Sequence, residues 1–482
     1  MKLLKSGSGL PAQRRLSSRW ALASLALSTL LASLGASVAT VGLPTLAQAL
    51  DASFQQVQWV VLAYLLAITT LIVSVGRLGD LIGRRKLLLM GIALFTLASA
   101  LCGVAPSLGW LVAGRALQGL GAAVMMTLTL ALVGETVAQE KTGSAMGLLA
   151  TLSAVGTALG PSMGGLLISR FGWQALFLVN VPLGLLTLLL AWRALPSRPT
   201  ANAERTRFDV TGTLLLALAL AAYALAMTTG RGDFGWVNGA LLLAAVCGGG
   251  LFILSQTRAA APLIHLALFR DRQLVSGLAT SALVATVMMA TLLVGPFYLS
   301  IALGLPATLV GLVLTAGPCV AALAGVPAGY LADRFGVVPM RRAGLATLVL
   351  GCLMLSLVTP GLGIVGYVTS IVVTTFGYAL FQTATNTAVM AGVAANRRGV
   401  IAGLLNLSRN LGFFTGASVL GAIFAAASAM DDTRQATPEA LTDGLHMTFG
   451  IALALMVLAL VTAFRYRVPE PSDNHQQVTC ER

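Results

Sequence analysis

The chain has 482 residues, of which 57% are hydrophobic and only 10% are charged, and its mean hydropathy is +0.89. This composition excludes an ordinary soluble domain and indicates a membrane protein. The formal net charge of +14 is not accompanied by any nucleic-acid-binding pattern.

Apolar stretches long enough to cross a bilayer occur in succession from Trp20 almost to Phe464. A spanning helix needs about 20 mainly apolar residues. The first stretch comes after a basic segment and precedes "AQA" at 47–49, as in a cleavable signal peptide, but its length over 20–46 favours a retained helix. We predict an all-α membrane protein with 14 transmembrane helices over residues 20–43, 57–75, 87–105, 110–133, 144–168, 174–192, 210–228, 238–255, 274–298, 309–331, 343–358, 363–390, 400–427 and 447–464.

The distribution of Lys and Arg tests this count, because these residues concentrate in cytoplasmic loops. With a cytoplasmic N-terminus, 14 helices place 25 of the 30 basic residues on the cytoplasmic side. An even number of helices with both termini in the cytoplasm is therefore predicted. The net positive charge is an orientation signal for the cell membrane.

An internal repeat indicates how the helices are grouped. The segments "GRLGDLIG" at 76–83 and "GYLADRFG" at 329–336 share Gly, three residues, Asp, two residues and Gly, and each ends an even-numbered helix. Repeated halves around a midplane cavity are the usual construction of a secondary transporter, although two unrelated Gly-rich turns are an alternative. The predicted segments are a cytoplasmic tail (1–19), a six-helix bundle (20–192), a linker (193–209), two inserted helices (210–255), a second linker (256–273), a second six-helix bundle (274–464) and a cytoplasmic tail (465–482).

Four motifs in order resemble those of the major facilitator superfamily, in its 14-helix drug:proton antiporter branch. The segment "GRLGDLIGRRK" at 76–86 resembles the signature between helices 2 and 3, and "RALQGLGAA" at 115–123 resembles that of helix 4. The segment "GTALGPSMGG" at 156–165 resembles the exporter motif of helix 5, and "FGWQALFLVNVPLG" at 171–184 is similar to the segment after that motif in this branch. The resemblance implies the major facilitator fold, alternating access, a small-molecule substrate, a proton gradient as driving force without a cofactor, and a monomer in the bilayer.

The charged segment after helix 2 has a role implied by this resemblance, as a latch that closes the cytoplasmic side when the cavity faces outward. Arg84 lies four residues after Asp80, close enough for a charge-assisted pair. Glu135 is added to the latch as a hypothesis. It lies 20 residues after Arg115, about 30 Å farther along helix 4 and therefore at the cytoplasmic end of that helix. The alternative is a solvated cluster that only sets the orientation of the chain in the membrane. It would explain the arginines but not Asp80. The predicted latch and gating residues are Gly76, Asp80, Gly83, Arg84, Arg85, Glu135, Gly329 and Asp333.

The helix 5 motif contains small residues at helical spacing. Gly156, Gly160 and Gly164 recur at i, i+4 and i+8, so a neighbouring helix can approach closely. Pro161 should bend the helix, and Gly165 ends the motif. We interpret this face as a gating contact between the halves, with ordinary helix packing as the alternative.

Charged and polar side chains inside spans are the remaining site candidates. A charge within a span costs about 2.5–3.5 kcal/mol by insertion scales, so it is a functional candidate by default. Arg115 matches the Arg of the helix 4 motif, which the resemblance implicates in proton coupling, and Arg409 is the second candidate; snorkelling or a structural hydrogen bond is the alternative for each. The candidates for the substrate cavity are Gly35, Trp59, Tyr64, Gln118, Tyr298, Gln382, Asn386 and Asn406.

Helix 1 departs from the family pattern. Relatives that export cationic drugs often carry an Asp nine residues before the helix 1 Pro, whereas this chain has Gly35 before Pro44. No acidic residue falls near the middle of a predicted span. A deep carboxylate could both bind a cation and exchange it for a proton, so the proton carrier and the preference for cations stay open.

Three functions, two of them in transport and one enzymatic, are compatible with these patterns. A proton-coupled exporter of small hydrophobic or amphiphilic compounds is favoured by the helix 5 motif, and a transporter of a neutral or anionic metabolite is favoured by the missing acid. A polytopic membrane enzyme is the remote alternative, because no catalytic constellation is present. The five cysteines show neither a disulfide framework nor a metal-ligand spacing, so no metal site is predicted.

Overall fold

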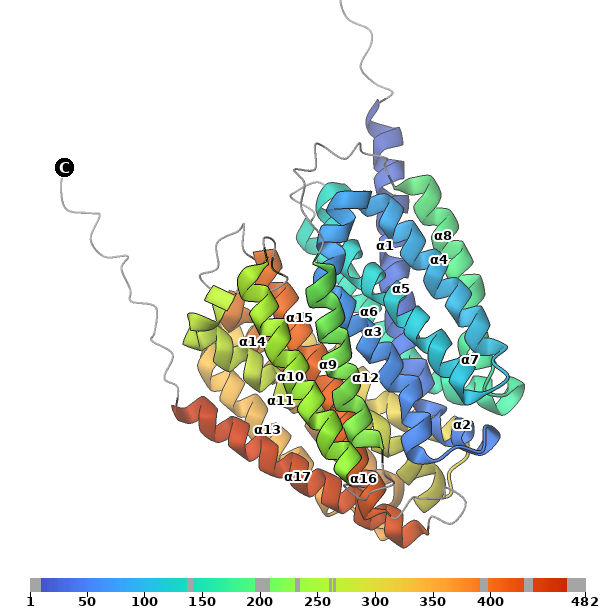
Figure 1. Cartoon of the computed structure of the whole chain (residues 1–482), viewed down its shortest axis with the longest axis vertical. Coiled ribbons are helices and arrows are strands. Elements are labelled where there is room, and N and C mark those ends of the chain that lie inside the picture. The colour runs from blue at the N-terminus through green and yellow to red at the C-terminus, as the bar shows by residue number, and fades with distance from the viewer. Residues whose placement is uncertain are drawn as a thin grey trace, which may run out of the picture.

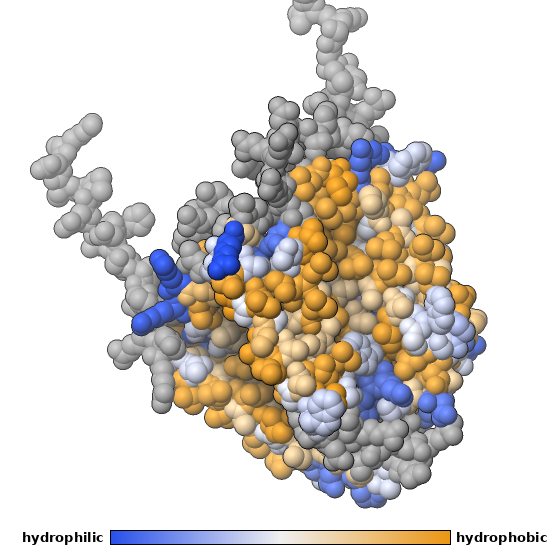
Figure 2. Space-filling model, viewed as in Figure 1, coloured by the Kyte–Doolittle hydropathy of each residue, from blue (hydrophilic) through white to orange (hydrophobic). Residues whose placement is uncertain are grey.

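The computed structural model describes residues 10–136, 142–195, 209–229, 235–259, 262, 266–390, 398–428 and 437–465. Every regular element within these ranges is a helix, and 14 spans are long and apolar enough to cross a membrane. The predicted all-α class and number of spans are therefore confirmed. A helix satisfies its own backbone hydrogen bonds, which is the requirement that lipid imposes on a spanning segment. Figure 2 shows apolar side chains over most of one flank, with hydrophilic side chains toward its ends.

The N-terminal helices form one bundle (Figure 1), in which α1 packs against α5, α6 and α8, and α4 packs against α5 and α8. The short α7 and α8 together form the sixth span. The bounds of this part are α1 (Leu10–Val41), α2 (Leu43–Ala49), α3 (Phe54–Ile82), α4 (Arg84–Gly103), α5 (Leu108–Thr136), α6 (Thr142–Phe171), α7 (Ala175–Leu178) and α8 (Asn180–Ala194).

The C-terminal helices form a second bundle, in which α13 packs against α14 and α17, and α11 packs against α15. Two spans contain a π-helical segment, η3 after α11 and η5 between α15 and α16. The bounds are α11 (Arg272–Phe297), η3 (Tyr298–Ala302), α12 (Ala307–Phe335), α13 (Val337–Ser356), η4 (Pro360–Leu362), α14 (Gly363–Met390), α15 (Arg398–Thr415), η5 (Gly416–Leu420), α16 (Gly421–Ala427) and α17 (Pro438–Arg465).

Two further helices, α9 (Val210–Thr228) and α10 (Trp236–Arg258), lie between the bundles in the chain, and a short 3-10 helix, η2 (Leu266–Arg270), comes after them. Trp59 Nε1 on α3 donates to Thr228 Oγ1 on α9 at 3.1 Å. On the other side of α9, the ring of Tyr223 lies 6.3 Å from that of Phe414 on α15. Of the two helices drawn in green in Figure 1, α9 thus contacts both bundles, and α10 packs on α9.

The charged segment at 76–86 is more helical than a connecting loop would be. Helix α3 continues to Ile82, α4 begins at Arg84, and the single residue between them, Gly83, has φ of +99°. The second copy has the same break, with Gly336 at φ of +86° between α12 and α13. Only glycine adopts this backbone conformation without strain, so the repeated Gly is explained by a one-residue turn.

The last linker is also shorter than expected. The spacing predicts a polar linker to residue 446, whereas α17 begins at Pro438. Proline is well suited to the first helical turn, where its missing N–H is not needed. Thr437 Oγ1 accepts a hydrogen bond from Ala440 N at 3.2 Å and so caps the start of the helix.

The two bundles meet at the end that the basic residues predict to be outside, at the lower end of Figure 1. The Phe54 ring at the start of α3 lies 4.9 Å from that of Phe297 and 5.3 Å from that of Phe424, both in the C-terminal bundle. Gln58 Nε2 donates to the carbonyl oxygen of Ala417 across the same interface. We call Phe54, Gln58, Phe297 and Phe424 the outer seal, and their contacts close this end.

Helices α6 and α12 approach closely beside the outer seal. A Cβ atom added to Gly311 on α12 would lie 2.2 Å from the carbonyl oxygen of Pro161, and one added to Gly165 on α6 would lie 2.3 Å from that of Ala307. Both distances are too short for any side chain. The outer contact between the halves therefore depends on glycine at these positions.

We predict that Gly311→Val prevents this contact and raises the fraction of molecules open to the outside, with at least about a tenfold loss of transport. The measurement is the distance distribution between spin labels at Phe171→Cys and Leu309→Cys in a background without native cysteines. Gly325→Val is the matched control, because a Cβ atom at Gly325 on the same helix meets nothing within 4 Å. An unchanged distribution for Gly311→Val would contradict the assignment.

Candidate functional site

Arg115 is fully buried in α5 and is held by main-chain groups of two other helices. Its Nε donates to the carbonyl oxygen of Val60 on α3 at 2.9 Å, and its Nη1 donates to that of Gly35 on α1 at 3.0 Å. Nη1 also donates to Gln118 Oε1 at 2.6 Å. No acidic side chain pairs with this guanidinium among the residues that the structure describes. One cation therefore joins three helices of the N-terminal bundle.

Aromatic rings complete the surroundings of this cation. The Tyr64 ring centre lies 4.1 Å from Arg115 Cζ, and that of Phe177 lies 5.9 Å away. The ring faces attract the guanidinium electrostatically, most strongly when water is excluded. The Tyr64 hydroxyl donates to the Ala32 carbonyl oxygen at 3.1 Å, which fixes the ring on α1. Tyr64, a predicted cavity residue, thus has its ring on Arg115.

Gln118 extends the network to α4. Its Nε2 donates to Ser99 Oγ at 2.8 Å, and the Ser99 hydroxyl donates to the Phe95 carbonyl oxygen at 2.7 Å. Gln118 has no exposed surface. We predicted it as a cavity residue, and the structure places both ends of its amide in hydrogen bonds inside the bundle.

Gly35 lies where cation-exporting relatives often carry an Asp, and its carbonyl group contacts Arg115. A Cβ atom added here would lie 2.6 Å from Cζ of Phe95 and 3.8 Å from Gln118 Nε2. The position therefore faces the interior of the N-terminal bundle. A carboxylate there would be close to Arg115 as well as to Phe95.

The C-terminal bundle contains a second arginine with neutral partners. Arg409 Nη2 donates to Asn406 Oδ1 at 2.6 Å, and Arg409 also hydrogen-bonds to the Tyr378 hydroxyl on α14. Asn410 Nδ2 donates to the Asn406 carbonyl oxygen at 2.8 Å. Arg115 and Arg409 thus lie in different bundles, and each has its own set of partners.

The other cavity candidates are not brought together. Tyr298 is buried and stacks on Tyr367 at 5.9 Å within the C-terminal bundle, and Trp59 hydrogen-bonds to α9. Gln382 is half-buried and Asn386 is exposed, one turn apart on α14. Trp59 is also half-buried, but its ring nitrogen is hydrogen-bonded to α9, so the pair on α14 is the better candidate for a cavity wall.

The helix 5 glycines contact both α1 and α12. Cβ atoms added to Gly156 or Gly164 would lie 2.6 Å from Leu30 O or Val41 Cγ1 on α1, and one added to Gly160 would overlap the Ser37 hydroxyl. Gly165 and Pro161 face α12 instead. The motif therefore packs α6 within its own bundle on one side and across the interface between the halves on the other.

The predicted latch is only partly described. The side chains of Asp80, Glu135 and Asp333 lie outside the part of the structure that is described, so the latch role stays a prediction. An added Cβ atom at Gly76, Gly83 or Gly329 meets nothing within 4 Å, so close packing does not require glycine at these positions. Gly79 is the tightly packed glycine of this segment, with Leu128 Cδ2 at 2.8 Å and Arg84 Cγ at 3.3 Å from such an atom. The outer end is closed here, so no contact of the latch with the other half is required.

The outer seal is the part of the site that we did not predict from the sequence. In the sequence, Phe54 lies just before the second predicted span, and Phe297 and Phe424 look like ordinary apolar residues of two other spans. Gln58 was an available signal, because it is an amide within an apolar run of the sequence and an amide that becomes buried needs a partner; the structure buries it fully.

Comparisons with known proteins agree with this arrangement. Residues 25–417 match the family model of the Major Facilitator Superfamily, so the chain belongs to this family of membrane transporters. It is 34% identical over 405 residues to multidrug resistance protein Stp of Mycobacterium tuberculosis, covering 82% of this chain and 73% of Stp. It is 32% identical to the multidrug efflux pump LfrA of Mycolicibacterium smegmatis, covering 94% and 91%, and 26% identical to the riboflavin transporter RibZ of Clostridioides difficile, covering 93% and 97%.

A solved structure shares the fold. An inward-facing, unoccupied bacterial homologue of the human lysosomal transporter Spinster matches with a TM-score of 0.67 at 16% identity, covering 95% of this chain and 97% of that one. Membership of the Major Facilitator Superfamily, together with the 14 spans, makes the chain a multi-pass membrane transporter of small molecules.

We predict that Gly35→Asp shifts the relative transport toward cations, because the new carboxylate offsets the positive field of Arg115. The measurement compares flux of a quaternary ammonium dye with that of a neutral compound of similar size. Gly35→Ala is the control, since it displaces Phe95 without adding charge. An unchanged preference in Gly35→Asp would contradict the prediction and would indicate that the field of Arg115 does not set the choice between cationic and neutral substrates.

Proposed function

We propose that the chain is a proton-coupled exporter of small hydrophobic or amphiphilic compounds that works by alternating access in the cell membrane, with both termini in the cytoplasm. Stp and LfrA, whose names describe multidrug resistance and efflux, support the substrate class. The glycine contact of α6 with α12 supports an outer gate between halves. No cofactor takes part in this proposal, and the proton gradient supplies the energy to a monomer.

The buried Arg115 network carries the proposal of proton coupling. A fixed cation in a low-dielectric site strongly favours the charged form of any nearby acid and disfavours a nearby second cation. Because Gly35 supplies no carboxylate, the network should favour neutral or weakly ionised substrates over permanent cations. Gln382 and Asn386 on α14 are proposed to contact the substrate as uncharged hydrogen-bonding groups.

A second function is favoured by the absence of a carboxylate at Gly35 and by the similarity of the chain to RibZ. A transporter of a neutral or anionic metabolite also needs no deep carboxylate, and RibZ is named as a riboflavin transporter. The two functions differ in the range of compounds, and the second includes both exporters and importers, whereas both use the same alternating halves.

The test is transport in reconstituted vesicles under an imposed pH gradient, with cationic, neutral and anionic compounds in parallel. We expect gradient-driven movement of neutral amphiphiles of several structures against their concentration gradient. Transport of a single metabolite class would favour the second function. A flux that does not depend on the imposed pH gradient would contradict proton coupling.

In the same vesicles, we predict that Arg115→Lys lowers gradient-driven flux by at least about tenfold. Lysine keeps the charge but loses the planar donors that reach Val60 and Gly35 together, and one charged hydrogen bond contributes about 1.5–3 kcal/mol. Arg341→Lys is the matched control, because Arg341 is another buried arginine, 4% exposed, on α13 of the other bundle. If the flux of Arg115→Lys and that of Arg341→Lys depend equally on the pH gradient, Arg115 has a structural role alone.

A further inference from the structure

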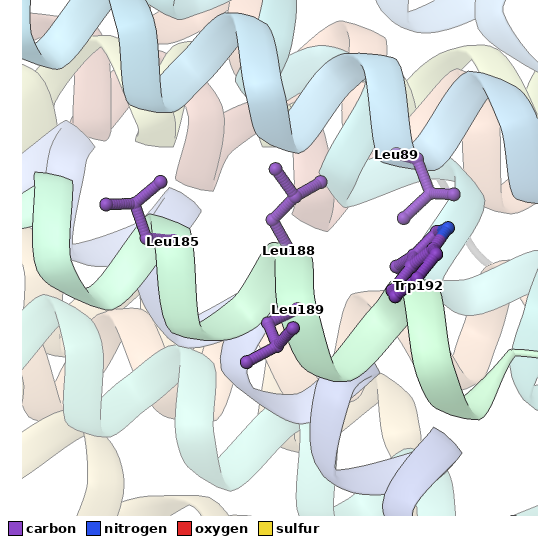
Figure 3. A pocket seen from close by; sticks show the side chains of 5 residues that line it. All are labelled: Leu89, Leu185, Leu188, Leu189 and Trp192. Atoms are coloured by element: carbon purple, nitrogen blue, oxygen red, sulfur yellow. The ribbon is translucent and has the colours of Figure 1, made fainter.

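A groove on the membrane-facing flank lies outside the site described above, between α4 and α8. Its volume is about 420 Å³, and its lining is apolar, with Leu89 on α4 and Leu185, Leu188, Leu189 and Trp192 on α8 (Figure 3). Leu185 is 56% exposed, and Trp192 at one end is 60% exposed. An open apolar groove on a spanning helix pair faces the hydrocarbon chains of the bilayer, so a lipid chain is the occupant that its surroundings supply.

Basic side chains stand at the Trp192 end of this groove. Arg85 Nη2 donates to the Trp192 carbonyl oxygen at 2.6 Å, which joins the start of α4 to the end of α8. Lys86 precedes Leu89 by three residues, and Arg193 lies four residues after Leu189, so each lies one turn beyond a groove residue on the same helix face. Both of these basic side chains are exposed. The apolar walls therefore continue into a cationic end.

The position of this end in the membrane is set by two independent features. The basic residues of the chain predict that the α3–α4 connection and the end of α8 are cytoplasmic. Trp192 has the amphipathic ring that is enriched at the boundary between hydrocarbon and headgroups. The cytoplasmic leaflet carries anionic lipids, and basic pockets between helices on that side bind their headgroups.

We propose that this groove binds one anionic phospholipid of the cytoplasmic leaflet. One acyl chain lies against Leu185, Leu188 and Leu189, and the phosphate group lies between Lys86 and Arg193. Arg85 positions the two helices through its hydrogen bond to the Trp192 carbonyl group. A zwitterionic lipid would fill the apolar part but would bring its own cation to the basic end, and free glycerol phosphate would lack the chain.

The test uses the fluorescence of Trp192 in the purified full-length protein, taken as the difference between wild type and Trp192→Phe. Phosphatidylglycerol or phosphatidylcholine with brominated acyl chains is titrated into detergent micelles, because bromine quenches a tryptophan in contact with it. We expect half-quenching of the Trp192 signal at an at least tenfold lower mole fraction of phosphatidylglycerol. Each basic side chain near an anionic surface contributes about fivefold in affinity.

The double variant Lys86→Gln/Arg193→Gln should remove this preference. Arg258→Gln/Arg272→Gln, which removes two exposed basic residues near other cytoplasmic helix ends, should retain it. Glycerol phosphate without acyl chains should not reverse the quenching. Equal quenching by both lipids in the wild type, an unchanged preference in Lys86→Gln/Arg193→Gln, or displacement by glycerol phosphate would overturn the proposal.

Discussion

The guanidinium group of Arg115 is a charge without any exposed surface, and the arrangement of the N-terminal bundle depends on how it is satisfied. Its hydrogen bonds end on carbonyl oxygens of α1 and α3 and on an amide of its own helix. A helical carbonyl oxygen has a second lone pair, so it can accept from Arg115 without leaving its own helix ladder. If α1 or α3 moved away, a buried charge would lose a partner, at a cost of several kcal/mol. These helices are therefore expected to move as one body.

A rigid N-terminal bundle confines the moving parts to the interface between the halves. There the contacts are small and reversible: glycine against main chain between α6 and α12, and three phenylalanine rings with one glutamine in the outer seal. None of these contacts is an ion pair, so opening exposes no unpaired charge. Helix α9 touches α3 and α15 through side chains that can adjust, which lets it cover the seam in more than one state.

The same cation has a consequence for substrate choice. Where cation-exporting relatives often carry an Asp, this chain presents only the main-chain carbonyl group of Gly35 to Arg115. The interior around it is therefore positive, with Phe95 filling the volume that a side chain would need. A permanent cation would meet an unfavourable field there, whereas a neutral amphiphile would not. A preference for neutral substrates thus accounts both for the absence of an acid at Gly35 and for the packing of Phe95 against it.

The number of spans and the motifs could be predicted from the sequence because each signal is local: about 20 apolar residues, or a few residues at fixed spacing. The partners of polar side chains could not, because they depend on how each helix is rotated and which helix lies beside it. Tyr64 and Gln118 are polar residues in apolar spans, which suggested a cavity, yet both contact Arg115 from within the bundle. Gly83 was predicted as part of the latch, and the positive backbone angle that requires glycine there could not be predicted from the sequence. The rings of the outer seal come from spans that are far apart in the chain, and nothing local relates them.

If Arg115 governs the alternation of the two halves, the buried cation and the outer seal must be energetically connected. The direct measurement is the distance across the seal, between spin labels on the outer ends of α3 and α11 in lipid vesicles, as the pH is lowered on the outer side. We expect a shift from closed toward open populations in the wild type and no shift in Arg115→Lys. The same shift in both proteins would contradict the connection, because the seal would then respond to protons without Arg115.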